Sequence, residues 1–129
     1  MVESVAPAPK RILMIEDDAS IRLLLGFGLR RAGYQVEMAE NGALAKEHFQ
    51  AFTPDLILLD LYMPYFDGLS FLKWVRQDVG SKVPIIVISA AEKEIETAQK
   101  EGADAFLAKP VDIAELVACI EHNLNHEAV

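Results

Sequence analysis

The chain has 129 residues, which is the length of one compact domain, and 52% of them are apolar. Its 12 Lys and Arg against 20 Asp and Glu give a net charge of −8, which argues against a nucleic-acid surface, since such a surface needs a basic patch. The single cysteine, Cys119, allows no disulfide within the chain, and no apolar run approaches the ~20 residues that span a bilayer, so we expect a soluble, cytoplasmic protein without membrane contact.

The N-terminal part begins with a tail and then alternates between two patterns. Residues 1–9 are rich in Ala and Pro, and we expect them to be a disordered tail ahead of one domain over residues 10–126. The apolar run Ile12–Ile15 predicts a strand that is buried on both faces. Gly33 stands where the next helix needs a left-handed residue at its end. The apolar stripe of that helix consists of Ile21, Leu24, Leu25, Gly28 and Leu29.

The middle of the chain repeats this order of strand and helix. Residues 34–38 alternate between apolar and polar side chains, which predicts a half-exposed edge strand. A weaker helical pattern follows Asn41, and the run Leu56–Leu59 then predicts another strand that is buried on both faces. The stripe of the next helix consists of Leu69, Leu72, Val75 and Val79.

The C-terminal part adds two strands and two helices. The runs Ile85–Ile88 and Ala105–Ala108 predict strands that are also buried on both faces, with a weak helical pattern around Ile95 between them. Asp112 followed by Glu115 predicts the N-cap of a last helix. The stripe of this helix consists of Ile113, Leu116, Val117, Ile120 and Leu124.

Polar residues follow four of the predicted strands directly. Strands that alternate with helices predict a parallel sheet covered on both faces, and ligands of such sheets bind beyond the carboxyl ends of the strands. Several carboxylates in one pocket repel each other, so they indicate a Mg²⁺ site, while Lys and Ser suit a phosphoryl group. The residues are Glu16, Asp17 and Asp18 after the first strand, Asp60 after the third, Ser89 after the fourth and Lys109 after the fifth.

Five stretches together resemble the signatures of response regulator receiver domains, over about residues 10 to 125. The resemblance implies an α/β, flavodoxin-like (βα)5 fold with three layers, in which a five-stranded parallel sheet of order 2-1-3-4-5 carries helices on both faces. It also implies a two-component system, in which a histidine kinase or phosphotransfer protein donates a phosphoryl group and no separate substrate is turned over. The stretches are Ile12–Asp18, Asp55–Asp60, Met63-Pro64 with Asp67-Gly68, Ser89-Ala90 and Lys109-Pro110.

The resemblance implies a metal site around the phosphoacceptor. Asp60 would accept the phosphoryl group, and Glu16 and Asp17 would form the acidic pair beside it. The metal, Mg²⁺ or Mn²⁺, would be held by these three residues and by the backbone carbonyl of Tyr62.

A second set of implied roles concerns the phosphoryl group and the signal. Lys109 would bind the phosphoryl group, and the Lys109–Pro110 peptide bond would be cis. Ser89 and Phe106 would form a switch that reshapes the face of the fourth helix, fifth strand and fifth helix, where a downstream protein docks. The chain would be a monomer or a phosphorylation-dependent dimer.

Two further expectations concern signal lifetime and output. Tyr62 is bulky and Ala91 is apolar, and both would border the path of the hydrolytic water, which predicts slow self-dephosphorylation. After the last helix the chain ends at Val129 without room for an output module. It would therefore signal by docking on a partner, or be a receiver taken from a longer regulator.

Other interpretations of these residues remain open at this point. Glu16 and Asp17 could cap the first helix, Lys109 could face solvent, and Phe106 could be a core residue, whereas Asp18 is expected to be a cap or a solvated side chain and not a ligand. A flavin electron carrier shares the architecture but needs a phosphate loop where this chain has acids. A phosphatase with an aspartate nucleophile would need a second Asp at the position of Tyr62. A degenerate receiver would only dock.

Overall fold

The structure, a computed structural model, describes residues 8–63, 66–90 and 92–127. Its centre is a parallel sheet of order β2-β1-β3-β6-β7, which is 2-1-3-4-5 when its strands are counted along the chain. Residues 1–7 of the predicted tail lie outside the described residues, and residues 8–10 are exposed and belong to no helix or strand. The five strands are β1 Arg11–Ile15, β2 Gln35–Ala39, β3 Leu56–Asp60, β6 Ile85–Ser89 and β7 Ala105–Ala108.

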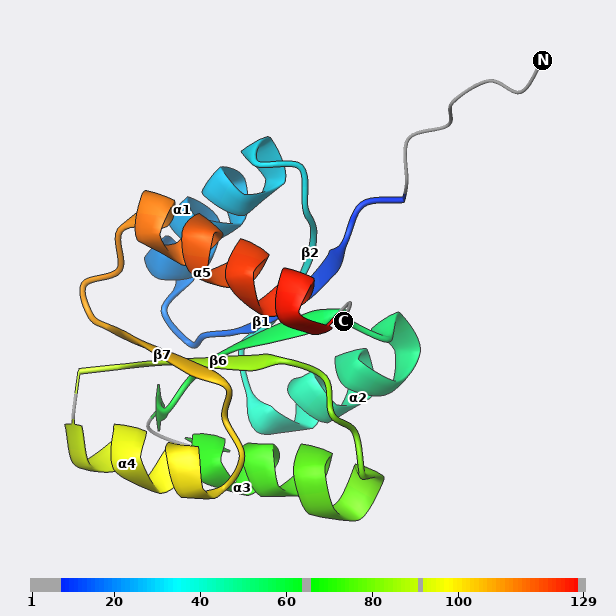
Figure 1. Cartoon of the computed structure of the whole chain (residues 1–129), viewed down its shortest axis with the longest axis vertical. Coiled ribbons are helices and arrows are strands. Elements are labelled where there is room, and N and C mark those ends of the chain that lie inside the picture. Colours follow the sequence, from blue (N-terminus) through cyan, green and yellow to red (C-terminus); the bar gives the residue numbers. More distant parts are fainter. Residues whose placement is uncertain (1–7, 64–65, 91, 128–129) are drawn as a thin grey trace.

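Helices cover both faces of this sheet, with α1 and α5 on one face and α2, α3 and α4 on the other (Figure 1). A short antiparallel pair, β4 Tyr62–Met63 and β5 Phe66–Asp67, follows β3. The three layers and the strand order confirm the predicted flavodoxin-like α/β fold. The helices are α1 Ala19–Arg31, α2 Gly42–Phe52, α3 Gly68–Lys73 with the π-helix η1 Trp74–Val79, α4 Glu92–Lys100 and α5 Ile113–Glu127.

The sheet separates two apolar cores. In β1, Leu13 and Ile15 pack in the core under α2, α3 and α4, whereas Ile12 and Met14 pack in the core under α1 and α5. β3 and β6 are likewise buried along their whole length. Because both faces of these strands are covered, apolar side chains occupy every position except the last, and polar groups are confined to the strand ends.

The two edge strands differ in how well the sequence predicted them. β2 is an edge strand, as its alternation predicts, and Glu37 on it pairs with His48 of α2 at 3.0 Å between Oε1 and Nδ1. The prediction that Ala105–Ala108 is buried on both faces is wrong, because this strand is β7, the other edge, and its residues are half-buried or exposed. A strand with a neighbour on one side only has less cover than an interior strand.

Local backbone signals agree with the predicted helix ends. The Asp18 carboxylate accepts a hydrogen bond from the backbone N–H of Ile21 at 2.9 Å, which makes Asp18 the N-cap of α1. The Asp112 carboxylate accepts one from the N–H of Glu115 at 3.3 Å at the start of α5. Gly33 follows α1 with φ of +100°, a left-handed conformation that glycine adopts without steric cost.

The third helix departs from its prediction in its second half. The sequence predicts one continuous helix with Val79 on its apolar stripe, whereas the structure changes from α3 to the π-helix η1 at Trp74. A π-helix bonds residue i to i+5, so its side chains no longer follow the 3.6-residue period. Val79 is accordingly 44% exposed instead of buried. Among the described residues, no helix combines the length and apolar character needed to cross a membrane.

Candidate functional site

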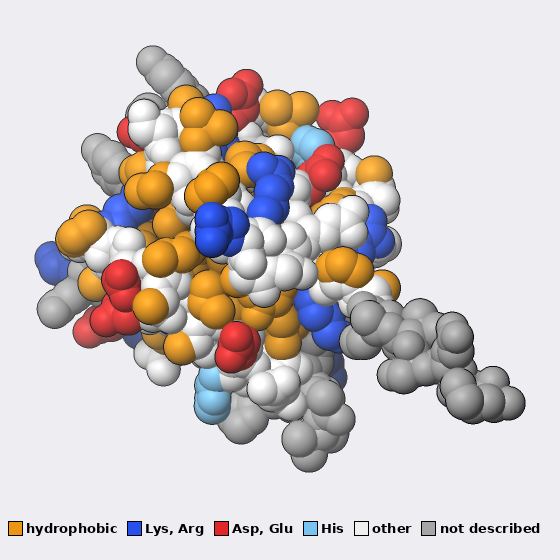
Figure 2. Space-filling view, turned by 90° about the horizontal axis from the view of Figure 1, so that it is seen from above, with side chains coloured by type: hydrophobic (Ala, Val, Ile, Leu, Met, Phe, Trp, Pro, Cys, Tyr) orange, Lys and Arg blue, Asp and Glu red, His pale blue; other side chains and the backbone are white. Residues whose placement is uncertain are grey.

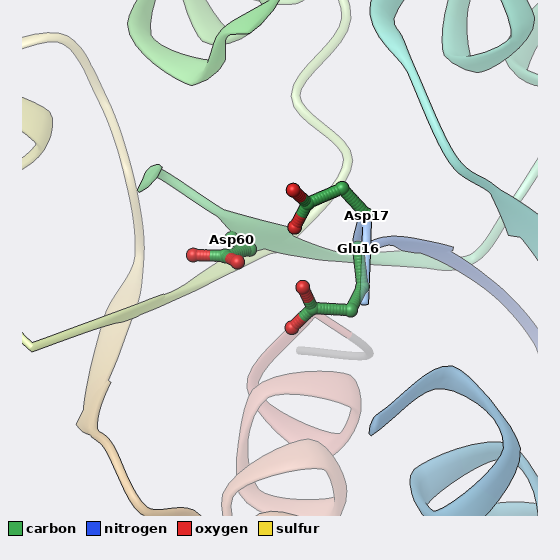
Figure 3. Close-up of side chains that lie close together, drawn as sticks. All are labelled: Glu16, Asp17 and Asp60. Carbon is green, nitrogen blue, oxygen red and sulfur yellow. The ribbon is translucent and has the colours of Figure 1, made fainter. Parts of the chain in front are cut away.

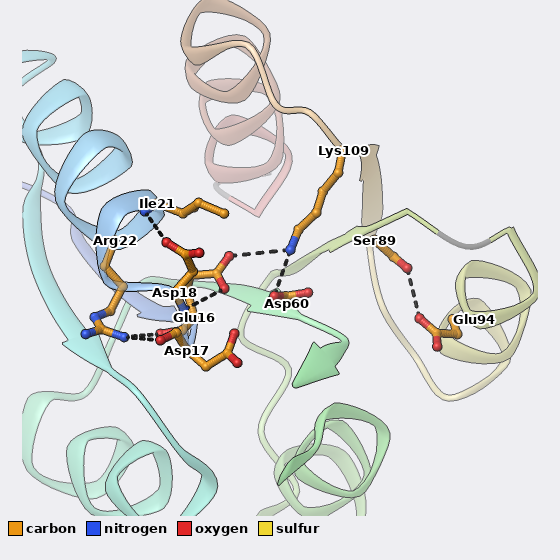
Figure 4. A network of polar contacts seen from close by, with 9 residues as sticks. All are labelled: Glu16, Asp17, Asp18, Ile21, Arg22, Asp60, Ser89, Glu94 and Lys109. Atoms are coloured by element: carbon orange, nitrogen blue, oxygen red, sulfur yellow. Dashed lines mark hydrogen bonds and ion pairs between the residues drawn. The ribbon is translucent and has the colours of Figure 1, made fainter. Parts of the chain in front are cut away.

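Four polar side chains from distant parts of the chain meet at the carboxyl edge of the sheet (Figure 4). Asp60 and Ser89 are the last residues of the neighbouring strands β3 and β6. Glu16 directly follows β1, and Lys109 directly follows β7. Since all these strands run in parallel, their carboxyl ends lie at one rim. The structure therefore brings the four polar residues together, as the sequence predicts.

Three carboxylates form the acidic part of this rim (Figure 3). Each of Glu16, Asp17 and Asp60 has one carboxylate oxygen that lies within 4.8 Å of the corresponding oxygens of the other two. Asp60 and Glu16 are 2% and 4% exposed, and Asp17 is exposed. Such a group of oxygens fits a hard divalent cation, which offsets the repulsion among the carboxylates.

The pKa of Glu16 reports how crowded this acidic group is. Burial, followed by the hydrogen bond and the negative charge of Asp60, together raise this pKa from 4.5 to about 7. The backbone N–H of Asp18, which donates to Glu16 Oε2 at 3.2 Å, and the charge of Lys109 oppose the rise. The metal-free site thus favours a proton on Glu16, where a bound cation would favour the carboxylate.

This shift predicts a pH dependence of stability in the metal-free protein. Between its ordinary pKa of 4.5 and about 7, Glu16 holds a proton in the folded protein but loses it in the unfolded chain. The folded state then binds more protons, so the free energy of unfolding falls as pH rises through this window, by on the order of 2 kcal/mol between about pH 5.5 and about pH 7. Urea unfolding at about pH 5.5 and about pH 8 measures the difference.

The matched variant for this prediction is Glu16→Gln. Without metal it should flatten the pH slope, because the amide does not titrate, and excess Mg²⁺ should flatten the slope of the natural chain. A variant that keeps the full slope would assign the dependence to other groups.

Lys109 supplies the positive charge of the site. Its Nζ lies 2.8 Å from Oδ2 of Asp60 and 3.6 Å from Oε1 of Glu16. Burial alone would lower the pKa of Lys109, but the hydrogen bond and charge of Asp60, with Glu16, raise it above its ordinary value. The ammonium therefore stays charged beside the carboxylates, and the Lys109–Pro110 peptide bond is cis, as the resemblance implies.

Arg22 holds the loop that carries the acidic pair, and the sequence did not single it out. Its Nη1 donates to the backbone carbonyls of Glu16 and Asp17 at 2.8 and 2.9 Å (Figure 4). Arg22 lies in the first turn of α1. Through this side chain the helix holds the loop that precedes it. The one signal in the sequence is an arginine close behind an acidic triplet, and that spacing alone is not specific.

The glycine of the Asp67-Gly68 signature lies close to the backbone of Asp60 and Leu61. A Cβ at this position would lie 3.0 Å from the backbone Cα of Leu61 and 3.1 Å from the carbonyl oxygen of Asp60. A Cβ here would require the backbone that follows the phosphoacceptor candidate to shift, so glycine suits this close approach of α3.

The implied switch residues lie on β6 and β7. The Ser89 hydroxyl donates to Oε2 of Glu94 on α4 at 3.0 Å, a partner that the sequence did not indicate. Phe106 is half-buried against the core under α2, α3 and α4. The predicted slow self-dephosphorylation rests on Tyr62 and Ala91, whose side chains lie outside the described residues, and it stays a prediction.

An apolar groove of about 400 Å³ adjoins the acidic rim on the side of α1 and α5. Its lining includes Lys109, Leu24 and Val111. Leu24 was predicted on the buried stripe of α1, but it is 71% exposed, because it lies at the margin of that stripe beside the groove. Apolar side chains gather on this face of the molecule, with Lys or Arg among them (Figure 2).

Comparison with known sequences gives consistent matches. A family model described as the response regulator receiver domain matches residues 12–121. The uncharacterized transcriptional regulatory protein YvcP of Bacillus subtilis is 39% identical over 113 residues, which cover 86% of this chain and 47% of that protein. The chain spans about half the length of the curated relatives that it matches first.

Solved structures agree with the sequence matches. The signal receiver domain of a response regulator from Bermanella marisrubri has a TM-score of 0.85 and 36% identity, covering 90% of this chain and 98% of that one. The chemotaxis protein CheY4 of Vibrio cholerae has a TM-score of 0.84 and 29% identity, covering 90% and 99%. In both cases the structural match covers nine-tenths or more of each chain.

Proposed function

This chain belongs to the response regulator receiver family of two-component signal transduction, and on that premise we propose that Asp60 is its phosphoacceptor. The observation that carries the proposal is the position of Asp60, which is buried, has a carboxylate oxygen within 4.8 Å of those of Glu16 and Asp17, and contacts Lys109 at 2.8 Å. Family membership also argues against a flavin carrier and an aspartate-nucleophile phosphatase.

The acidic cluster suits the divalent cation that receiver domains bind at such a pocket. We assign its protein ligands to Glu16, Asp17 and Asp60, with the backbone carbonyl of Tyr62 as a further one. When bound, Mg²⁺ or Mn²⁺ would neutralise charge on the transferring phosphoryl oxygens. Arg22 keeps the loop of Glu16 and Asp17 in place by binding its carbonyls.

The side chains of the rim suggest how the phosphoryl group is transferred. A carboxylate oxygen of Asp60 attacks phosphorus, and the bond from phosphorus to the imidazole nitrogen of a phosphohistidine donor breaks. The imidazole leaves with the electron pair and takes a proton from solvent. The Lys109 ammonium, already 2.8 Å from Asp60, stabilises the charge on the phosphoryl oxygens. No separate substrate is turned over.

A histidine kinase or phosphotransfer protein is the partner that this family implies. Leu24 of α1 lines the groove that adjoins the rim, and Leu24 and Phe27, both exposed, line the hollow next to it. A protein donor could pack on this face and bring its phosphohistidine to Asp60, because contiguous exposed apolar surface often marks an interaction site.

Output would follow from movement near Ser89. The new phosphoryl group would draw in the Ser89 hydroxyl, Phe106 would turn inward, and the face of α4, β7 and α5 would dock a downstream protein. Phosphorylation could also favour a dimer. Relatives include transcriptional regulators that are much longer than this chain, so its target stays a proposal.

Labelling with a small acyl phosphate tests the proposed function. With Mg²⁺ the chain should incorporate close to one phosphoryl group per molecule, and excess chelator should abolish incorporation, because the acidic group would then repel the incoming phosphate. The intact mass of the protein after incubation with acetyl phosphate, with and without chelator, measures the phosphorylated fraction directly. A chain that stays unlabelled with metal would be a receiver that only docks.

A further inference from the structure

The hydroxyl of Ser89 is already engaged by a carboxylate of α4. Ser89 is 1% exposed at the end of β6, and its Oγ donates to Oε2 of Glu94 at 3.0 Å (Figure 4). Glu94 lies in the first turn of α4 and is half-buried. The bond therefore ties a strand end at the site to the helix of the proposed output face.

This bond competes with the role that the proposed function gives to Ser89. A serine hydroxyl has one proton and can donate it to one acceptor at a time. A hydrogen bond to a carboxylate is stronger than one between neutral groups. A phosphoryl group on Asp60, which ends the neighbouring strand, can receive the proton of Ser89 only if Glu94 releases it.

We propose that Glu94 is a positioning residue that holds the Ser89 hydroxyl toward α4 in the unphosphorylated protein, so that phosphorylation must exchange one acceptor for the other. The proposal rests on the function proposed above. It makes Glu94 oppose activation, because the bond favours the inactive arrangement. It also links the site to α4, since the exchange breaks the hydrogen bond between the first turn of this helix and the end of β6.

Equilibrium binding of beryllofluoride, a phosphoryl mimic, in the presence of Mg²⁺ tests this. Glu94→Ala should bind the mimic about tenfold more tightly than the natural chain, because no acceptor holds Ser89 back. Glu94→Gln should fall between the two, since its amide oxygen accepts a weaker, uncharged hydrogen bond. Glu96→Ala removes an exposed carboxylate from the same helix and is the control for net charge.

A double-mutant cycle separates positioning from a general charge effect. In the background of Ser89→Ala, Glu94→Ala should leave the affinity unchanged, because the bond is already absent. The inference is overturned if Glu94→Ala behaves like Glu96→Ala, or if its effect persists without the hydroxyl. If the natural chain binds no mimic and takes no label, the proposed function itself fails; normal binding with a silent Glu94 overturns the inference alone.

Discussion

Asp60→Asn should abolish phosphate incorporation from acetyl phosphate. The amide of asparagine is not a nucleophile toward phosphorus, and the change also removes one of the three clustered carboxylates. We expect the labelled fraction to fall at least about a hundredfold, to the background of the assay. Intact mass and acid-labile label measure the loss on the same sample.

The control for this variant is Asp78→Asn, which changes an exposed carboxylate on η1 and should label as the natural chain does. Because Asp60 is buried, folding of the variant must be checked by its urea unfolding transition. Undiminished labelling of a folded Asp60→Asn would place the phosphoacceptor elsewhere, with Glu16 and Asp17 as the next carboxylates to test.

Lys109→Ala should have the second largest effect, on both reaction rate and stability. It removes the ammonium that lies 2.8 Å from Asp60 and 3.6 Å from Glu16. We expect labelling by acetyl phosphate to slow by about a hundredfold, since charge stabilisation by one positioned group is typically worth this much. The initial rate at saturating Mg²⁺ measures it.

The stability of the same variant tests the electrostatic account. Breaking a buried ion pair leaves carboxylates without compensation, but Lys109 is 26% exposed, so we expect a loss of about 1–3 kcal/mol without metal. Mg²⁺ should restore part of it, because the cation replaces the missing charge. Lys109→Arg should recover stability better than rate, because guanidinium keeps the charge but changes the contact geometry.

Lys82→Ala, on an exposed loop lysine, is the matched control and should leave rate and stability unchanged. If Lys109→Ala labels at the natural rate, this lysine is a structural partner of Asp60 and takes no part in transfer.

The residues of the site could be predicted from the sequence because each one stands at the end of an apolar run. Interior strands of a doubly covered sheet are apolar throughout, so a polar residue directly after such a run stands out. Parallel strands collect these residues at one edge, which is why Glu16, Asp60, Ser89 and Lys109 could be grouped without coordinates.

Other features could not be predicted, because they depend on how separate elements pack. Ala105–Ala108 has the same apolar pattern as the interior strands, so its pattern alone did not show that β7 is a half-exposed edge. The predicted apolar stripe of the third helix runs through Val79, whereas the structure has the π-helix η1 there. Periodicity reports the local conformation of a segment and not the cover that its neighbours provide.

The sequence by itself determined the alternation of strands and helices and the polar groups of the rim, since these follow from patterns within single segments, and its resemblance to five signatures implied the receiver family and the sheet order. The tertiary structure alone decided which side chains form hydrogen bonds with the residues of the rim. Arg22 holds the carbonyls of the acidic loop, and Glu94 holds the hydroxyl of Ser89. Such contacts join side chains across turns and element boundaries, where position along the chain follows no period and distance is set only by packing.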